Sequence, residues 1–282
     1  MTHLINRRAI LGGMCAATMT GHAQAQPIFR LGLTPVFLDN DAAVIDGLRR
    51  ALSRGMAREI ELVQRRTYQE ITGLLLERSV DAAWLCGYPY LQHADALDLV
   101  AVPVWRGGPR YQSYLIVAAD DAATGLTDLR GGTHAFSDPD SNSGYLVTAT
   151  DLRRMDERTE TFFSRSIFTY GHRNVVRAVA DGLVRSGSVD GYVWEALAMI
   201  EPALTKRTRI ISRSEWLGFP PVCARRDSIA SKPIQALQRA LLEMGQTDEG
   251  RQALEALQLD GFRQASDALF DGISDRMRDL EP

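Results

Sequence analysis

Residues 136–147 of the chain read Phe136-Ser137-Asp138-Pro139-Asp140-Ser141-Asn142-Ser143-Gly144-Tyr145-Leu146-Val147. A strand-like run precedes this stretch and a helical pattern follows it. Pro139 ends the strand, because the residue before a proline is driven out of the helical region. Ser141, Asn142 and Ser143 then place hydroxyl and amide donors beside the free N–H groups of a helix start, and Gly144 lets the backbone approach closely. The stretch predicts either a seat for a phosphate-like oxyanion or an ordinary helix N-cap, which prefers the same residue types.

Strand-like and helical patterns alternate on both sides of this stretch, and the alternation occurs twice. The first set has strands at 29–34, 59–64, 82–86, 99–105 and 114–118, with helices at 42–54 and 68–78. The second set has strands at 133–137, 167–170, 190–193 and 209–212, with helices at 144–155 and 174–182; a strand at 222–225 and helices at 232–247, 249–257 and 267–280 close the chain. This order is typical of an α/β fold with largely parallel sheets. Two such units without a flexible linker predict two lobes with a ligand cleft beyond the carboxyl ends of the strands.

The first 25 residues have the organisation of an export signal. Arg7 and Arg8 precede an apolar run from residue 9 to 19, and Ala23-Gln24-Ala25 offers an A-x-A cleavage site. The run is too short and too interrupted by glycine to span a bilayer. The paired arginines favour the twin-arginine route, although other secretory signals also carry one or two cations. Cleavage after Ala25 removes two arginines and no acidic residue, so the formal net charge of −3 becomes −5.

The composition is that of an ordinary globular protein. Of the 282 residues, 45% are hydrophobic and 24% are charged, which excludes a disordered or collagen-like chain and fits one large or two ordinary domains. The sequence pI near 6.0 argues against a general nucleic-acid binder. All 32 basic residues except Lys206 and Lys232 are arginines, which reflects either codon bias or a demand for guanidinium groups that bind anions. No segment after the signal reaches transmembrane length, so we expect an exported, soluble monomer without membrane insertion.

The motif at 138–144, D-P-x-S-x-S-G, resembles that of the phosphate-, phosphite- and phosphonate-binding proteins of the PhnD type, the substrate-binding components of ABC importers. Other segments agree with this family in order and spacing, from about residue 28 to residue 270. They are the tyrosine that opens the second helix (Tyr68), the V-D-x-A-W strand at 80–84, a cleft tyrosine (Tyr111), the glycine–histidine pair at 171–172, and a ligand-facing glutamate (Glu195). The breadth of this agreement favours the oxyanion interpretation over the plain N-cap.

The resemblance implies a type II periplasmic binding protein fold. Two lobes, each a mostly parallel sheet flanked by helices, would close on the ligand by hinge motion. Lobe 1 would comprise residues 26–115 and 220–282, and lobe 2 residues 116–219. The anion would be held by Ser141, Asn142 and Ser143 from one lobe, by Tyr68 and Tyr111 from the other lobe and the hinge side, and by His172, unless that histidine is only a surface N-cap residue.

One position departs from the family pattern. In aminophosphonate-binding members, an aspartate near the return crossover joins the glutamate in holding the ammonium group of the ligand. The matching stretch here is 216–221, and Phe219 takes the acidic position. Because only Glu195 would remain, an amino-bearing phosphonate is disfavoured. A phosphonate with an apolar substituent, a bare oxyanion or another small molecule fits better.

Cys86 is a second departure. It ends a predicted strand and faces the expected cleft, and Cys223 lies in the strand that returns beside it; both remain after Cys15 is removed with the signal. Three interpretations stay open, namely two buried small hydrophobic residues, a disulfide, and a soft-ligand site. The last would suit arsenite, which some relatives of this family sense before they signal to a membrane histidine kinase.

The sequence favours a binding protein over an enzyme. Ser141, His172 and Asp190 could suggest a hydrolase, but no G-x-S-x-G elbow is present. Signatures such as H-E-x-x-H and C-x-x-C are also absent, so we expect neither a metal nor a cofactor. The sequence therefore predicts a periplasmic solute-binding protein that captures a small oxyanion by lobe closure and delivers it to an ABC permease. The alternative is a periplasmic sensor, for example of arsenite through Cys86, that signals to a histidine kinase.

Overall fold

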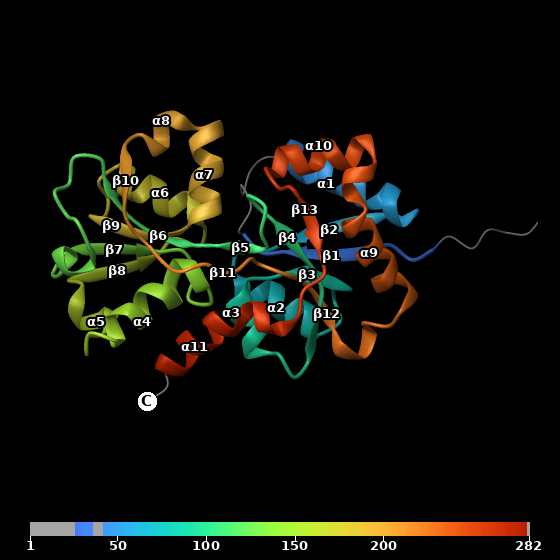
Figure 1. The fold of residues 1–282 in the computed structure, drawn as a ribbon, viewed down its shortest axis with the longest axis horizontal. Helices are drawn as coiled ribbons and strands as arrows, with labels where there is room; N and C mark the ends of the chain where they lie inside the picture. The colour runs from blue at the N-terminus through green and yellow to red at the C-terminus, as the bar shows by residue number, and fades with distance from the viewer. Residues whose placement is uncertain (1–25, 36–41, 281–282) are drawn as a thin grey trace, which may run out of the picture.

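The computed structural model describes residues 26–35 and 42–280, and the predicted export signal at 1–25 lies outside them. Two sheets lie side by side, each with helices on both faces (Figure 1). We call the larger sheet with its helices lobe 1 and the smaller sheet with its helices lobe 2. The predicted two-lobed α/β fold is therefore confirmed, but the sheets are mixed and not mostly parallel, because strands that cross from one lobe to the other or return late in the chain pair in the antiparallel sense.

Lobe 1 is built on a six-stranded mixed sheet in which β1 pairs in parallel with β2 and β3, and β4, β12 and β13 add antiparallel pairs. Its strand order is β13 (Gly261–Arg263), β4 (Leu97–Val104), β12 (Val222–Arg225), β3 (Ala82–Trp84), β1 (Phe29–Leu33) and β2 (Ile60–Gln64). Its helices are α1 (Ala42–Met56), α2 (Tyr68–Leu76), α3 (Gly87–Gln92), α9 (Lys232–Leu242), α10 (Asp248–Leu257) and α11 (Asp271–Leu280). Helix α1 forms because Val44, Leu48, Ala51 and Leu52 recur at helical spacing and bury one face.

Lobe 2 has a five-stranded mixed sheet with a parallel core of β9, β7 and β8 and antiparallel β6 and β10. Its strand order is β10 (Thr208–Arg213), β6 (Ser113–Ala118), β9 (Ser186–Asp190), β7 (Thr133–Phe136) and β8 (Arg165–Phe168). Its helices are α4 (Val147–Arg153), α5 (Thr159–Phe162), α6 (His172–Ala180), α7 (Gly191–Ile200) and α8 (Pro202–Thr205). A π-helical turn at Asn142–Leu146 precedes α4.

The predicted strand at 190–193 is wrong. The strand is β9, which ends at Asp190, and helix α7 begins at Gly191. Ser186, Gly187 and Ser188 resemble a turn in the sequence, yet they are fully buried because α6 packs closely on β9: a Cβ at position 187 would lie 2.5 Å from Val175. Asp190 is the N-cap of α7 and accepts the Val193 N–H at 3.3 Å.

Two chain crossings and one helix connect the lobes. The crossings pair as a short antiparallel ribbon of β5 (Arg110–Tyr111) and β11 (Leu217–Gly218). Helix α11 lies below the junction in Figure 1 and reaches α4, where the buried Arg276 guanidinium binds Glu215 at 2.7 Å and Asp151 at 2.8 Å. The predicted lobe boundaries stay a prediction. One of them was placed between residues 115 and 116, which lies within strand β6.

Candidate functional site

The loop between β7 and α4 contains the motif at 138–144 and is tightly built. The Ser141 hydroxyl accepts the Gly144 N–H at 3.0 Å, and the Ser141 carbonyl accepts the Leu146 N–H at 3.0 Å. Position 144 has to be glycine, because a Cβ there would lie 1.8 Å from Ser137 Oγ. Ser141, Asn142 and Ser143 are all buried, so the loop lies inside the junction of the lobes.

Tyr68 approaches this loop from lobe 1. Thr67 and Glu70 form a capping box that starts α2 and places Tyr68 as its first residue. The Tyr68 N–H donates to Asp138 Oδ2 at 3.2 Å, which ties the start of α2 to the loop of lobe 2. Burial, and then the nearby Cys86, Asp138 and Asp190, raise the pKa of Tyr68 well above its usual value. The phenol therefore stays protonated and remains a hydrogen-bond donor.

His172 meets Tyr68 across the cleft. Its Nε2 lies 3.1 Å from the Tyr68 hydroxyl, and its Nδ1 accepts the backbone N–H of Asp190 at 3.0 Å. Burial lowers the pKa of His172 to about 3, so the ring is neutral. Since Nδ1 is an acceptor, the single ring hydrogen is on Nε2 and is donated to the Tyr68 oxygen. The histidine is buried and is not a surface N-cap residue.

Tyr111 contributes a second buried phenol from the β5 crossing. Its hydroxyl accepts from Asn142 Nδ2 at 2.9 Å. Burial, followed by the charges of Cys86 and Asp190, raises its pKa well above the usual value. Asn142 Oδ1 has no hydrogen-bond partner although it is buried. The structure thus brings Tyr68, Tyr111, His172 and residues 141–143 of the motif loop into one buried cluster of polar groups, which we call the donor cluster.

Cys86 lies at the edge of the donor cluster as a free thiol. Its Sγ accepts the Asn142 N–H at 3.3 Å, and burial raises its pKa to about 12. The disulfide interpretation is wrong, because Cys86 and Cys223 are both free. Cys223 is paired in register with Ala83, three residues before Cys86, so the two thiols belong to different positions along the strand.

Phe219 closes the cluster on the hinge side. Its buried ring lies 5.6 Å from the ring of Tyr111 and 5.1 Å from that of Tyr192, centroid to centroid. These three rings form an apolar wall behind the donor cluster. That Phe219 takes the position of the carboxylate in aminophosphonate-binding relatives stays a prediction.

Glu195 lies further along α7 and has other partners. One oxygen binds Arg106 at 3.0 Å, and the other accepts the Tyr114 hydroxyl at 3.0 Å. The sequence suggested a ligand-facing role because Glu195 matches a glutamate of the family, but a sequence does not show which side chains surround that carboxylate. That role stays a prediction, and in this structure the carboxylate is already paired with a guanidinium.

Asp190 and Asp138 are buried acidic residues of the site that sequence reasoning did not single out as ligand contacts. Burial raises the pKa of Asp190 to about 7, and burial also raises the pKa of Asp138. Asp138 accepts two backbone N–H groups, from Tyr68 and from Asp140. Asp190 could have been found as a helix N-cap, since Asp followed by Gly opens an apolar helical run.

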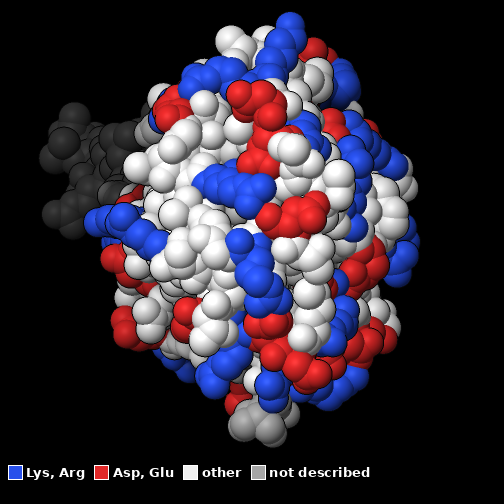
Figure 2. All heavy atoms as spheres, turned by 90° about the vertical axis from the view of Figure 1, so that its left-hand side faces the viewer, with Lys and Arg blue, Asp and Glu red and all other residues white. Residues whose placement is uncertain are grey.

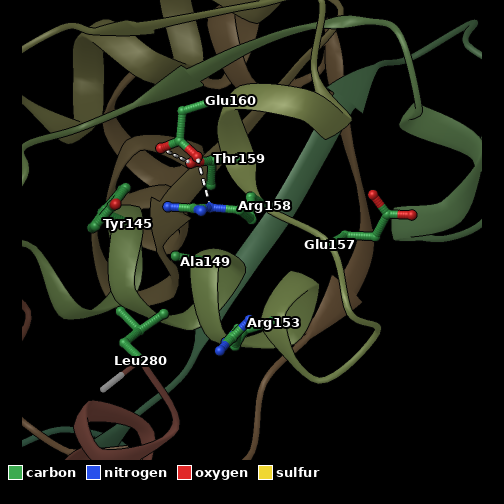
Figure 3. A pocket seen from close by; sticks show the side chains of 8 residues that line it. All are labelled: Tyr145, Ala149, Arg153, Glu157, Arg158, Thr159, Glu160 and Leu280. Carbon is green, nitrogen blue, oxygen red and sulfur yellow. Dashed lines mark hydrogen bonds and ion pairs between the residues drawn. The ribbon is translucent and has the colours of Figure 1, made fainter. Parts of the chain in front are cut away.

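A separate hollow of about 220 Å³ lies on lobe 2 beside α4 and α5 (Figure 3). Three of its four charged side chains are in ion pairs, Arg158 with Glu160 and Glu157 with Arg130 at 2.6 Å, and the fourth is Arg153. It contains none of the predicted site residues. The end of lobe 2 that faces away from lobe 1 shows interspersed basic and acidic side chains without a broad basic field (Figure 2).

Comparison with known proteins agrees with the two-lobed fold. The family model described as "ABC transporter, phosphonate, periplasmic substrate-binding protein" matches residues 31–270. A binding protein component of an ABC phosphonate transporter from Pseudomonas aeruginosa has a TM-score of 0.82 at 21% identity, covering 89% of this chain and 86% of that one. PhnD1 from Prochlorococcus marinus in complex with methylphosphonate has a TM-score of 0.77 at 16% identity, covering 90% and 98%.

A more distant structure has the same fold. The alkanesulfonate-binding protein SsuA from Xanthomonas axonopodis pv. citri, bound to MOPS, has a TM-score of 0.62 at 16% identity, covering 92% of this chain and 96% of that one. In the part of the chain that the structure describes, no helix combines the length and the apolar character needed to cross a membrane.

Proposed function

The chain belongs to the periplasmic substrate-binding protein family of phosphonate ABC transporters, and from that premise we propose that its donor cluster binds a phosphonate, phosphite or phosphate anion. The ligand would be enclosed between the lobes in the periplasm and delivered to an ABC permease. The family match supports this transport role over the sensory alternative through Cys86. A thiol whose pKa is raised to about 12 is also a poor source of the thiolate that a soft ligand needs.

The arrangement of His172 and Tyr68 supports the proposal most directly. Because Nδ1 of His172 accepts the Asp190 N–H, Nε2 must donate to the Tyr68 oxygen. The hydroxyl hydrogen of Tyr68 is then directed away from His172 and is available to an anion. A chain of donors that ends in a buried phenol stabilises an oxyanion without a formal positive charge.

Neutral donors suit a protein whose net charge is negative. Tyr68, Tyr111, Asn142 and Ser143 together carry hydroxyl and amide hydrogens in this buried cluster. In a buried site, such fixed dipoles interact with a charge more strongly than they would in water. Selectivity for an oxyanion would therefore come from the geometry of the donors.

An ammonium-bearing ligand fits the site poorly. Phe219 presents a ring in place of a carboxylate, and Glu195 is engaged by Arg106 and Tyr114. Releasing Glu195 to a ligand would leave the Arg106 guanidinium without its ion pair. We therefore expect methylphosphonate, phosphite or phosphate to bind more tightly than 2-aminoethylphosphonate.

The test is titration calorimetry of the mature protein with methylphosphonate, phosphite, phosphate and 2-aminoethylphosphonate. Ser143→Asp should abolish binding, because it adds a carboxylate to the donor cluster. Tyr68→Phe keeps the ring and removes only the hydroxyl, and it should raise Kd by about 10-fold or more, as expected for a lost hydrogen bond to a charged group.

Tyr90→Phe is the matched control. The Tyr90 hydroxyl is also hydrogen-bonded, to Asp267 at 2.5 Å, but it lies within lobe 1 away from the donor cluster. Its removal should leave Kd unchanged. Wild-type affinity in Tyr68→Phe, or tighter binding of 2-aminoethylphosphonate than of methylphosphonate, would contradict the proposal.

A further inference from the structure

A hollow of about 640 Å³ opens at the outer edge of the cleft, and we call it the mouth hollow. It lies close to the donor cluster, since Arg66 is two residues before Tyr68 and Tyr170 is two residues before His172. Tyr68 and His172 are the pair that meets across the cleft at 3.1 Å. The polar lining used in the argument comes from both lobes: Gln64, Arg65 and Arg66 from lobe 1, and Thr169, Tyr170 and Asn174 from lobe 2.

The lining of the mouth hollow is rich in donors and carries more positive than negative charge. Arg65 and Arg66 contribute two guanidinium groups, and neither takes part in an ion pair with the acidic residues that the structure describes. The carboxylate of Glu70 also lines the hollow, but it accepts the Thr67 N–H at 2.9 Å and the Thr67 hydroxyl at 3.0 Å. Hydrogen bonds from Thr67, and then the charge of Arg65, lower the pKa of Glu70. The Arg65 guanidinium donates to the Gln64 carbonyl oxygen at 2.8 Å, whereas the Arg66 guanidinium has no hydrogen bond to the residues that the structure describes.

Arg66 and Tyr170 join the lobes at the mouth. The Arg66 guanidinium lies 5.3 Å from the centroid of the Tyr170 ring, which is within the range of a cation–π interaction. Stacking occupies the face of a guanidinium and leaves its N–H groups, which lie in the plane, free to bind an anion. Tyr170 has a φ of +52°, a conformation that costs free energy for a residue other than glycine and that concentrates at ligand clamps.

The inner end of the donor cluster offers no comparable space. The rings of Tyr111, Phe219 and Tyr192 pack against one another there and are buried. A substituent on the bound oxyanion would therefore point towards the mouth hollow, where the first groups it meets are cationic.

Resting on the proposed function, we propose that the mouth hollow is a second anion subsite, which binds a carboxylate or phosphate group at the far end of a phosphonate or phosphate ligand through Arg66 and Arg65. Because Arg66 and Tyr170 come from different lobes, the subsite is complete only when the lobes meet. The second anion then stabilises the closed arrangement.

The test compares two ligands by titration calorimetry of the mature protein. Phosphonoacetate carries a second anionic group and methylphosphonate does not. We expect phosphonoacetate to bind about 10-fold more tightly in the wild type, as for a charge-assisted bidentate contact. Arg66→Gln should reduce this ratio to below about threefold, whereas Tyr170→Phe, which keeps the ring, should preserve it.

The matched control is Arg239→Gln, which removes the same charge from the exposed face of α9 on lobe 1. It should leave the ratio of the two affinities at the wild-type value. An effect of the protein's net charge is thereby separated from an effect of Arg66 in the mouth hollow. Equal affinities for the two ligands in the wild type, or an unchanged ratio in Arg66→Gln, would overturn the subsite alone. If neither phosphonate binds, the proposed function fails and the subsite fails with it.

Discussion

Two buried histidines of lobe 2 have the same protonation state but differ in which lobe supplies their hydrogen-bond partners. Burial lowers the pKa of both His134 and His172 to about 3, so both rings are neutral. His134 lies in β7, and its two nitrogens are 2.7 Å from the Ser186 hydroxyl and 2.9 Å from the Ser188 hydroxyl of neighbouring β9. Its ring stacks on Phe163, with the centroids 4.4 Å apart. Every one of these partners belongs to lobe 2.

His172 divides its partners between the lobes. Its Nδ1 is held by the backbone of Asp190 in lobe 2, but its Nε2 reaches Tyr68 of lobe 1. Separation of the lobes breaks only the second contact, whereas the hydrogen bonds of His134 survive any motion that keeps lobe 2 intact. Burial and a shifted pKa therefore do not distinguish a binding residue from a structural one. The distinction depends on whether a hydrogen-bond partner belongs to a part of the molecule that can move away.

The largest expected effect concerns ligand affinity. In His172→Asn, the amide oxygen replaces Nδ1 and keeps the Asp190 N–H satisfied, but the Nε2–H that positions Tyr68 is lost. We expect Kd for methylphosphonate to rise about 30-fold, which corresponds to about 2 kcal/mol. The same replacement at His134 should change Kd by less than about twofold. Titration calorimetry of the two variants measures the difference in Kd. An equal loss of affinity in both would contradict the distinction between His172 and His134.

The second prediction concerns stability and its dependence on pH. His134→Asn should lower the free energy of unfolding at pH 7 by about 2 kcal/mol, because it loses packing and one hydroxyl partner. The unfolded histidine takes up a proton near pH 6.5 and the folded one only near pH 3, so His134 alone costs the wild type up to about 1.4 kcal/mol per pH unit as pH falls below 6.5, and the equal share of His172 is common to both proteins. The difference between wild type and variant should close by about pH 5. Urea unfolding at both pH values measures it, and a constant difference would contradict the folded-state pKa.

The smallest expected effect concerns Asp190, which holds His172 through its backbone. Its carboxyl group has a pKa of about 7, so it is neutral below that pH and becomes a carboxylate beside the bound anion above it. Wild-type affinity for methylphosphonate should therefore weaken about threefold from pH 6 to pH 8 relative to Asp190→Asn, whose amide still caps α7. The titration of the ligand itself is common to both proteins and cancels in the ratio. Parallel pH profiles would show that the carboxyl group does not face the anion.

The sequence was most informative where local chemistry decides the structure. The motif at 138–144 predicted a strand, a sharp turn and a helix start with buried donors, because proline, glycine and hydroxyl side chains restrict the backbone by themselves. The helical pattern at 42–54 predicted α1 for the same kind of reason, and Val44 and Leu48 lie on its buried face. The strand at Ser186–Asp190 was missed because small residues favour turns locally, and only the close packing of α6 makes them suitable for a buried strand.

The sequence by itself thus determined the two α/β units, the position of the oxyanion-type loop, and a set of polar residues that includes Tyr68, Tyr111 and His172. Only the tertiary structure decided how these residues are paired: which nitrogen of His172 carries the hydrogen, why Glu195 is engaged by Arg106, and why Cys86 and Cys223 stay apart. Residue type and spacing limit local conformation, but a hydrogen-bond partner or a pKa depends on groups that the fold brings in from distant parts of the chain. For the same reason, the Arg66–Tyr170 contact at the cleft mouth has no signature in the sequence.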